Sequence, residues 1–312
     1  MRPAGAPAHL PEARAPAAAR RGLWFAAGAI GLWCFTGLCF AAGSRALGPM
    51  VYTTLVSLVG VAVGAALHRA RQRPLAGLVS MPPRVWAAGF LGIAVYTVLL
   101  VLAVGVATER DLAQVALVNY LWPVLMVLFA CLLLPDRPPL GRALLGAALG
   151  LAGVAAVRGV DTFARPPADL LPHAMALAGA CLWALYSVLL RRWRVPEEHN
   201  GSTAQFALCA ALAATVGMAR GEWAAAPHLT PAAVFWVLFC GVGPVGLGYY
   251  WWEIGVKQAP PHLAATLSFS IPVVSAVLIG LAYRQALSPG LLPGAALITL
   301  GAVVARGART PA

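Results

Sequence analysis

Ten apolar runs constrain this chain more than any other feature, because each approaches the length of a helix that crosses a bilayer. Such a helix needs about 20 residues. Hydrophobic residues make up 61% of the 312 residues and charged residues only 10%, whereas a soluble domain is about a quarter charged. The sequence therefore predicts an all-α integral membrane protein with ten transmembrane helices, and it excludes a soluble enzyme, a disordered chain and a large extramembrane domain. The runs lie at about 23–42, 48–67, 85–105, 112–134, 140–157, 170–190, 204–219, 232–255, 263–283 and 290–305.

The basic residues lie at the ends of the apolar runs rather than on one face. With the N-terminus inside, most of the 22 Lys and Arg residues fall in cytoplasmic segments, as the positive-inside rule requires. We therefore expect both termini in the cytoplasm, with residues 1–21 as a disordered tail and 307–312 as a short one. The net charge of +12 is then a topology signal, and nucleic acid is not an expected partner.

No motif for a metal, a cofactor or a reaction is visible. The six cysteines lie inside apolar runs without zinc or redox spacing, so we expect small core residues and no metal site. The chain contains no Walker loop and no HExxH pattern, which are the signatures of nucleotide and zinc-protease chemistry. We expect neither an enzyme nor a bound cofactor.

The two halves of the chain repeat one another. Residues 116–123 align with residues 265–272, and Gly153 and Trp33 align with Gly301 and Trp183 at a nearly constant offset. Each half holds five spans, so the second copy must enter the membrane from the opposite side. The sequence predicts a five-plus-five inverted-topology repeat, residues 22–158 and 169–306, which is the hallmark of alternating-access transporters with a site near mid-membrane.

Prolines interrupt equivalent spans of the two halves. Pro123 cannot donate a hydrogen bond to the carbonyl of Asn119, and Pro272 cannot donate to that of Ser268. A freed carbonyl in the bilayer must be buried in protein or line a cavity. Both prolines can be plain packing kinks, or the freed groups can accept from the ammonium of a substrate. Pro244, in a glycine-rich stretch, is expected as a third hinge.

Several aromatic residues lie within spans, where the interfacial belt of Trp and Tyr does not explain all of them. They can be ordinary packed bulk. They can also line a slot in which a flat ring stacks or a cation is held. The candidates are Trp33, Tyr96, Trp122, Trp183, Tyr186, Tyr249 and Trp252.

Glu253 is the one of ten acidic residues that lies within an apolar run. A carboxylate in the membrane is by default a candidate for proton or cation coupling. Lys257 follows four residues later, in the favourable order for a helical ion pair. We therefore favour a salt bridge over coupling, with coupling as the alternative.

These features resemble the drug/metabolite transporter superfamily of the EamA type, over about residues 23–305. The string Asn119-Tyr120-Leu121-Trp122-Pro123 is similar to the fourth span of its bacterial aromatic amino acid exporter branch. Residues 251–255, with the sequence WWEIG, look like the eighth span of that branch. The resemblance implies export of aromatic amino acids, and it implies site positions at Asn119, Tyr120, Trp122, Pro123, Trp252 and Pro272.

We therefore expect an efflux transporter of the bacterial inner membrane that exports amino acids, aromatic ones first, by alternating access. Its partners would be a small-molecule substrate and the lipid bilayer. A monomer would suffice, although Gly146 and Gly150 could pack helices within one chain or between two. The alternatives are an exporter of another metabolite or a flat cationic drug and, in a different class, a membrane assembly or sensor subunit.

Overall fold

The computed structural model describes residues 14–109, 111–135, 140–159, 166–197, 199–225, 229–284 and 287–306. Within these residues every regular element is helical. Among the described residues, nine helical stretches are long and apolar enough to cross a membrane, and a shorter apolar helix covers Leu291–Ala305. The all-α membrane class is thereby confirmed.

Each half of the chain is a succession of α-helices with short 3-10 or π-helical segments between them. The first half contains α1 (Arg14–Trp33), α2 (Thr36–Leu47), α3 (Pro49–Ala70), η1 (Leu75–Leu78), α4 (Pro83–Gly89), η2 (Phe90–Val95), α5 (Tyr96–Val106), α6 (Leu112–Asn119), α7 (Trp122–Leu133) and α8 (Leu140–Arg158). The second half contains α10 (Leu171–Arg192), α11 (Ser202–Ala219), α12 (Glu222–Ala225), α13 (Pro231–Cys240), η3 (Gly241–Gly248), α14 (Tyr249–Gln258), α15 (Pro261–Ser268), α16 (Ser270–Tyr283) and α17 (Leu291–Arg306).

The first helix starts earlier than the sequence pattern indicates. α1 begins at Arg14, so residues 14–21 of the predicted N-terminal tail are helical. Alanine and arginine dominate that stretch, and both are strong helix formers. The remainder of that tail, and the predicted C-terminal tail 307–312, lie outside the described residues.

Several spans are interrupted midway. α6 ends at Asn119, four residues before Pro123, and α15 ends at Ser268, four residues before Pro272. Pro244 lies inside η3, a stretch of π-helix. Each break follows from a missing proline N–H, which removes one rung of the hydrogen-bond ladder.

Two interruptions have no proline. η2 is a π-helix over Phe90–Val95, and α1 and α2 are separated at Cys34 and Phe35. Short π-helical segments inside α-helices are frequent at functional sites. The apolar pattern of the sequence predicts continuous spans at both places. A short change in the number of residues per turn, as in a π-helix, does not alter that pattern visibly.

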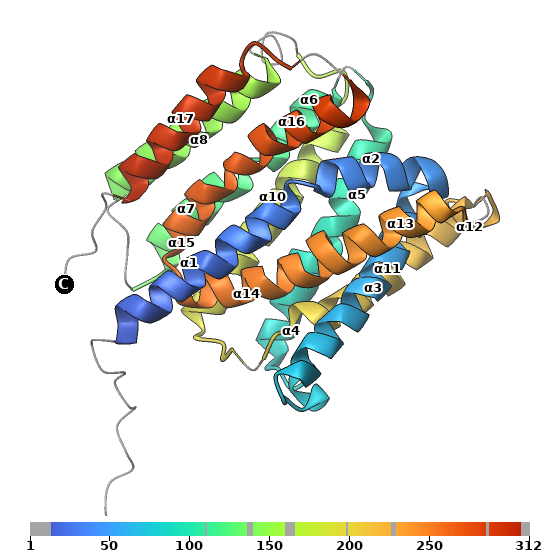
Figure 1. Cartoon of the computed structure of the whole chain (residues 1–312), viewed down its shortest axis with the longest axis horizontal. Coiled ribbons are helices and arrows are strands. Elements are labelled where there is room, and N and C mark those ends of the chain that lie inside the picture. The colour runs from blue at the N-terminus through green and yellow to red at the C-terminus, as the bar shows by residue number, and fades with distance from the viewer. Residues whose placement is uncertain are drawn as a thin grey trace, which may run out of the picture.

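Two helix pairs flank a central group (Figure 1). α8 and α17 lie side by side at one end, and α3 and α11 lie together at the other. Between them, α1 packs on α14, and α10 packs on α5 and α7. The central helices are the interrupted ones and their neighbours, so the irregular backbone is concentrated in the middle of the protein.

Glycines allow α8 and α17 to approach closely. A Cβ on Gly146 would lie 2.8 Å from the carbonyl of Gly301, and one on Gly153 would lie 2.6 Å from that of Gly294. Only glycine permits such backbone contact between helices. Gly150 packs against the ring of Phe269. Gly146 and Gly150 are therefore used for packing within the chain.

Candidate functional site

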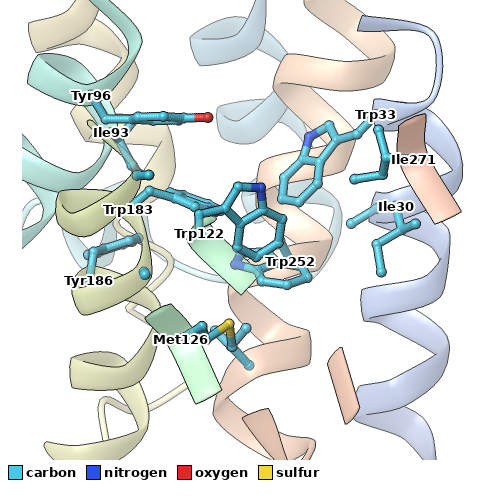
Figure 2. Close-up of a cluster of buried hydrophobic side chains, with 14 of the residues drawn as sticks. Ile30, Trp33, Ile93, Tyr96, Trp122, Met126, Trp183, Tyr186, Trp252 and Ile271 are labelled. Atoms are coloured by element: carbon cyan, nitrogen blue, oxygen red, sulfur yellow. The ribbon is translucent and has the colours of Figure 1, made fainter. Parts of the chain in front are cut away.

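Aromatic side chains from the central helices meet in the interior (Figure 2). They come from α1, α5, α7, α10 and α14, and all are buried except Tyr249, which is half-buried. We call this group the aromatic cluster. Its members are Trp33, Tyr96, Trp122, Trp183, Tyr186, Tyr249 and Trp252.

Trp183 is the hub of the aromatic cluster. Its ring centroid lies 5.7 Å from that of Tyr96 and 6.0 Å from that of Trp252, in both cases in a stacked arrangement. Trp33 and Tyr249 meet it edge-on at 5.7 and 5.2 Å. These are the favourable geometries for aromatic pairs. Because the rings contact one another, a ligand can enter only if they separate.

Four members of the cluster sit at the helix interruptions. Trp33 is the last residue of α1, and Trp122 is the first residue of α7. Tyr96 directly follows η2, and Tyr249 directly follows η3. A change in backbone torsion at an interruption would therefore move a ring of the cluster directly.

Two indoles of the aromatic cluster already have hydrogen-bond acceptors. Trp33 Nε1 donates to the carbonyl of Pro244 at 3.0 Å, and Trp252 Nε1 donates to Ser187 Oγ at 3.2 Å. Ser187 is not among the residues predicted from the sequence, although it follows Trp183 by four residues and so lies on the same face of α10.

Asn119 offers an acceptor beside the cluster. Its Oδ1 is buried, and among the described residues no group forms a hydrogen bond to it within 3.5 Å. The Asn119 side chain lies close to the hydroxyl of Tyr96. Thr97 Oγ1, next to Tyr249, is also buried and has no hydrogen-bond partner among the described residues. Most buried polar atoms are paired, so these acceptors suit a ligand that brings a donor.

The other polar candidates of the two broken spans are placed differently. Ser268 is fully buried, and its Oγ donates to the carbonyl of Ala264 at 2.8 Å within its own helix. Tyr120 is half-buried between α6 and α7, close to Tyr96. The two breaks are therefore alike in backbone and unlike in polar chemistry.

Glu253 is an anchored carboxylate. Its Oε1 accepts from Lys257 Nζ at 2.8 Å and from the amide of Gly201 at 3.0 Å, and its Oε2 accepts from the amide of Ser202 at 2.8 Å. The side chains of Glu253 and Lys257 are only 2% and 6% exposed. The predicted ion pair is present. The carboxylate also caps the start of α11, where free amides and the helix dipole favour negative charge.

At the same end of the molecule, Glu197 gathers arginines. Its Oε1 lies 2.9 Å from Arg21, 3.7 Å from Arg71 and 3.6 Å from Arg73. Gln258 donates to its other oxygen at 2.8 Å. Glu197 follows α10, while the arginines belong to α1 and to the end of α3, so this cluster ties the two halves of the chain together.

Asp111 ties the halves at another point. Its carboxylate accepts from the amides of Ala168 at 3.2 Å and Asp169 at 3.3 Å, just before α10. Burial alone would raise the pKa of Asp111, but hydrogen bonds from Ala168, Thr108 and Asp169 outweigh it and hold the pKa below its usual range. Asp111 is not among the site residues predicted from the sequence.

The cysteines and other candidate metal ligands form no site among the described residues. All six cysteines are free, and none is exposed. In the part of the chain that the structure describes, no group of three or more His, Cys, Asp or Glu residues could hold a metal ion.

The chain is similar to a family of transporters, to named exporters and to a solved structure. The EamA-like transporter family matches residues 170–307. An aromatic amino acid exporter YddG from Ancylobacter novellus is 34% identical over 89% of this chain and 94% of its own length. The exporter of that name from Salmonella typhimurium is 28% identical over 72% of this chain and 77% of its own length. A solved crystal structure with 32% identity covers 93% of this chain and 97% of its own, with a TM-score of 0.79.

Proposed function

Because this chain belongs to the EamA-like transporter family and is therefore a multi-pass membrane transporter of small molecules, we propose that it exports aromatic amino acids across the bacterial inner membrane. The observation that carries the proposal is the aromatic cluster with the unpaired Asn119 Oδ1 beside it. The names of the relatives support the same substrate class.

The substrate site would form within the aromatic cluster. A substrate ring would take the place of one ring contact of Trp183, stacking on Tyr96 or Trp252. The substrate ammonium would donate to Asn119 Oδ1. Binding at this point would exchange a ring contact of Trp183 for a contact with the substrate ring. It would also give Asn119 Oδ1 the hydrogen bond that it lacks among the described residues.

The inverted repeat has support from contacts between equivalent residues. Trp33 and Trp183, which align in the two halves, touch each other at the centre. In the aligned halves Gly146 is equivalent to Gly294, and Gly153 to Gly301. These glycines of α8 and α17 contact in a crossed pair, Gly146 with Gly301 and Gly153 with Gly294, as a pseudo-twofold axis would require. The family match over residues 170–307 also begins and ends close to the predicted second repeat.

Alternating access would use the interruptions as hinges. Pro123, Pro244 and Pro272 lie in or beside them, and the rings attached there would separate as the halves rock. The contacts of Glu197 and of Asp111 join the halves in two places and would open in turn. By the positive-inside rule, the arginines around Glu197 support a cytoplasmic location for that end of the helix bundle.

Glu253 would anchor α11 to α14 rather than couple transport to protons. Its oxygens are occupied by Lys257 and two amides. Export would then proceed down the substrate gradient without a proton gradient.

The test is efflux of labelled tryptophan and phenylalanine from proteoliposomes that contain only this protein. We expect flux without a pH gradient, inhibited by aromatic amino acids more than by leucine or by quaternary ammonium compounds. Inhibition by quaternary ammonium compounds alone would replace the proposal with drug export. No flux of aromatic amino acids from folded protein would transfer the function to another metabolite.

A further inference from the structure

A groove of about 590 Å³ lies between the start of α1 and α14, away from the aromatic cluster. Its lining combines two guanidinium groups with three aromatic rings and a glycine. These residues are Arg20, Arg21, Trp24, Phe25, Gly28 and Trp251. The Trp24 side chain is 74% exposed, so the groove is on the outer surface of the helix bundle.

The charge of the groove is one-sided. Arg20 is exposed and has no ion-pair partner among the described residues. Arg21 pairs with Glu197, but Arg71 and Arg73 surround the same carboxylate. Three arginines therefore share the single carboxylate of Glu197, and Arg20 adds a fourth guanidinium group beside them. The positive charge that remains would be neutralised by a bound anion.

The position of the groove is that of the lipid headgroups. Arg20 and Arg21 directly precede the apolar part of the first span, and the exposed Trp24 comes one turn later. Tryptophan prefers this depth of the membrane, and arginine beside it attracts anionic headgroups. Below the arginines, the ring of Trp251 packs directly against Gly28, where a Cβ would lie 2.9 Å from its Cε3, so the groove has a flat apolar wall.

We propose that this groove binds an anionic phospholipid of the adjacent leaflet. The phosphate would lie between Arg20 and Arg21, where guanidinium groups form charge-assisted hydrogen bonds. An acyl chain would follow Phe25 and Trp251 past Gly28. The lipid would bridge α1 and α14, which carry Trp33, Tyr249 and Trp252, and would stabilise their packing.

The test compares the full-length protein in detergent with added phosphatidylglycerol or phosphatidylcholine, by native mass spectrometry and by thermal unfolding. We expect retention of phosphatidylglycerol and a higher melting temperature with it than with phosphatidylcholine. Arg20→Gln should weaken phosphatidylglycerol retention about five-fold, since one basic residue near the surface contributes about that much. Arg20→Gln/Arg21→Gln should abolish the preference.

The matched control is Arg69→Gln/Arg192→Gln, which removes two exposed arginines that end α3 and α10. It should keep the full preference. Because the readout is the difference between two lipids, a general loss of stability from breaking the Arg21–Glu197 pair cancels. An unchanged preference in both groove variants, or an equal loss in the control, would overturn the proposal. Equal stabilisation by inorganic phosphate would also overturn it, since the site would then bind a free anion.

Discussion

Asn119 and Glu253 both place buried oxygens near the aromatic cluster, yet their surroundings differ. The two oxygens of Glu253 accept three hydrogen bonds, from Lys257, Gly201 and Ser202. The Oδ1 of Asn119 accepts none from the described residues. One residue closes a junction between two helices, and the other ends a broken helix beside stacked rings.

The difference separates an anchor from a binding group. Leaving a buried acceptor unpaired costs about 1–3 kcal/mol, and a residue that only filled space would be better apolar. A carboxylate whose two oxygens both already accept hydrogen bonds within the protein has less to offer a substrate than an unpaired acceptor. Burial of a polar group in the membrane is therefore a weak indicator of function by itself, and the completeness of its hydrogen bonding is the stronger one.

The largest expected effect comes from Glu253→Ala. The change leaves the Lys257 ammonium in a 6% exposed position and removes the acceptor of the Gly201 and Ser202 amides. Breaking a buried ion pair by removing one partner destabilises a fold by about 3–5 kcal/mol. We expect a large drop of the melting temperature in detergent and a low yield of folded protein.

Glu253→Ala/Lys257→Met is the control for this effect, because it removes the uncompensated charge and should recover part of the melting temperature. The anchor assignment fails if Glu253→Gln keeps wild-type stability while flux in proteoliposomes loses a response to the pH gradient. That pattern would make Glu253 a coupling residue.

Asn119→Ala should reverse this pattern, with transport lost and stability kept. A hydrogen bond to a charged group contributes about 1.5–3 kcal/mol, so we expect efflux of labelled tryptophan to fall roughly 10- to 100-fold. The melting temperature should stay the same or rise slightly, because an unpaired acceptor is removed.

Ser268→Ala is the matched control at the equivalent break. Its efflux should stay within about two-fold of the wild type, because the hydroxyl bonds only its own helix. Equal loss in both variants would show that any change at a break impairs transport, and the comparison between Asn119 and Glu253 would then say nothing about the substrate.

Much of this architecture is local in the sequence. Apolar length predicts the spans, and the missing N–H of Pro123 and Pro272 predicts breaks that fall at Asn119 and Ser268. The aromatic residues are selected from the sequence because the interfacial belt does not explain all of them. In the structure they also meet in space. The ion pair of Glu253 with Lys257 follows from helical spacing alone.

The rest depends on contacts between distant segments. The capping of α11 by Glu253 joins groups that are separated by 51 or 52 positions in the sequence. No local pattern indicates such a contact. The π-helix at Phe90–Val95 contains no proline. Nor does any pattern distinguish Asn119 from Ser268, since only packing determines that one is unpaired and the other paired within its helix.

Trp122→Leu tests whether the unpaired acceptor is linked to the rings. Trp122 lies on the same broken span as Asn119 and meets Trp183 edge-on at 6.2 Å. An aromatic contact contributes about 0.5–1.5 kcal/mol beyond burial, so the preference for tryptophan over leucine should fall roughly two- to ten-fold. Trp236→Leu, at a ring outside the cluster, should keep the preference. A similar fall in that control would remove the cluster from substrate selection.

Asp111→Asn gives the smallest expected effect and extends the comparison to a second fully paired carboxylate. The pKa of Asp111 is held below its usual range in the folded protein, so its ionised form stabilises the fold at neutral pH. That contribution is present above the ordinary carboxyl pKa and is lost as the pH falls through the lower folded value. The melting temperature of the variant should therefore lie below that of the wild type from pH 7 to about 5, and the gap should close at more acidic pH. A gap that does not narrow as the pH falls below the ordinary carboxyl pKa would mean that Asp111 acts through shape rather than through its charge. Efflux at neutral pH should keep its preference for aromatic substrates, because Asp111, like Glu253, holds backbone amides and leaves the substrate acceptor to Asn119.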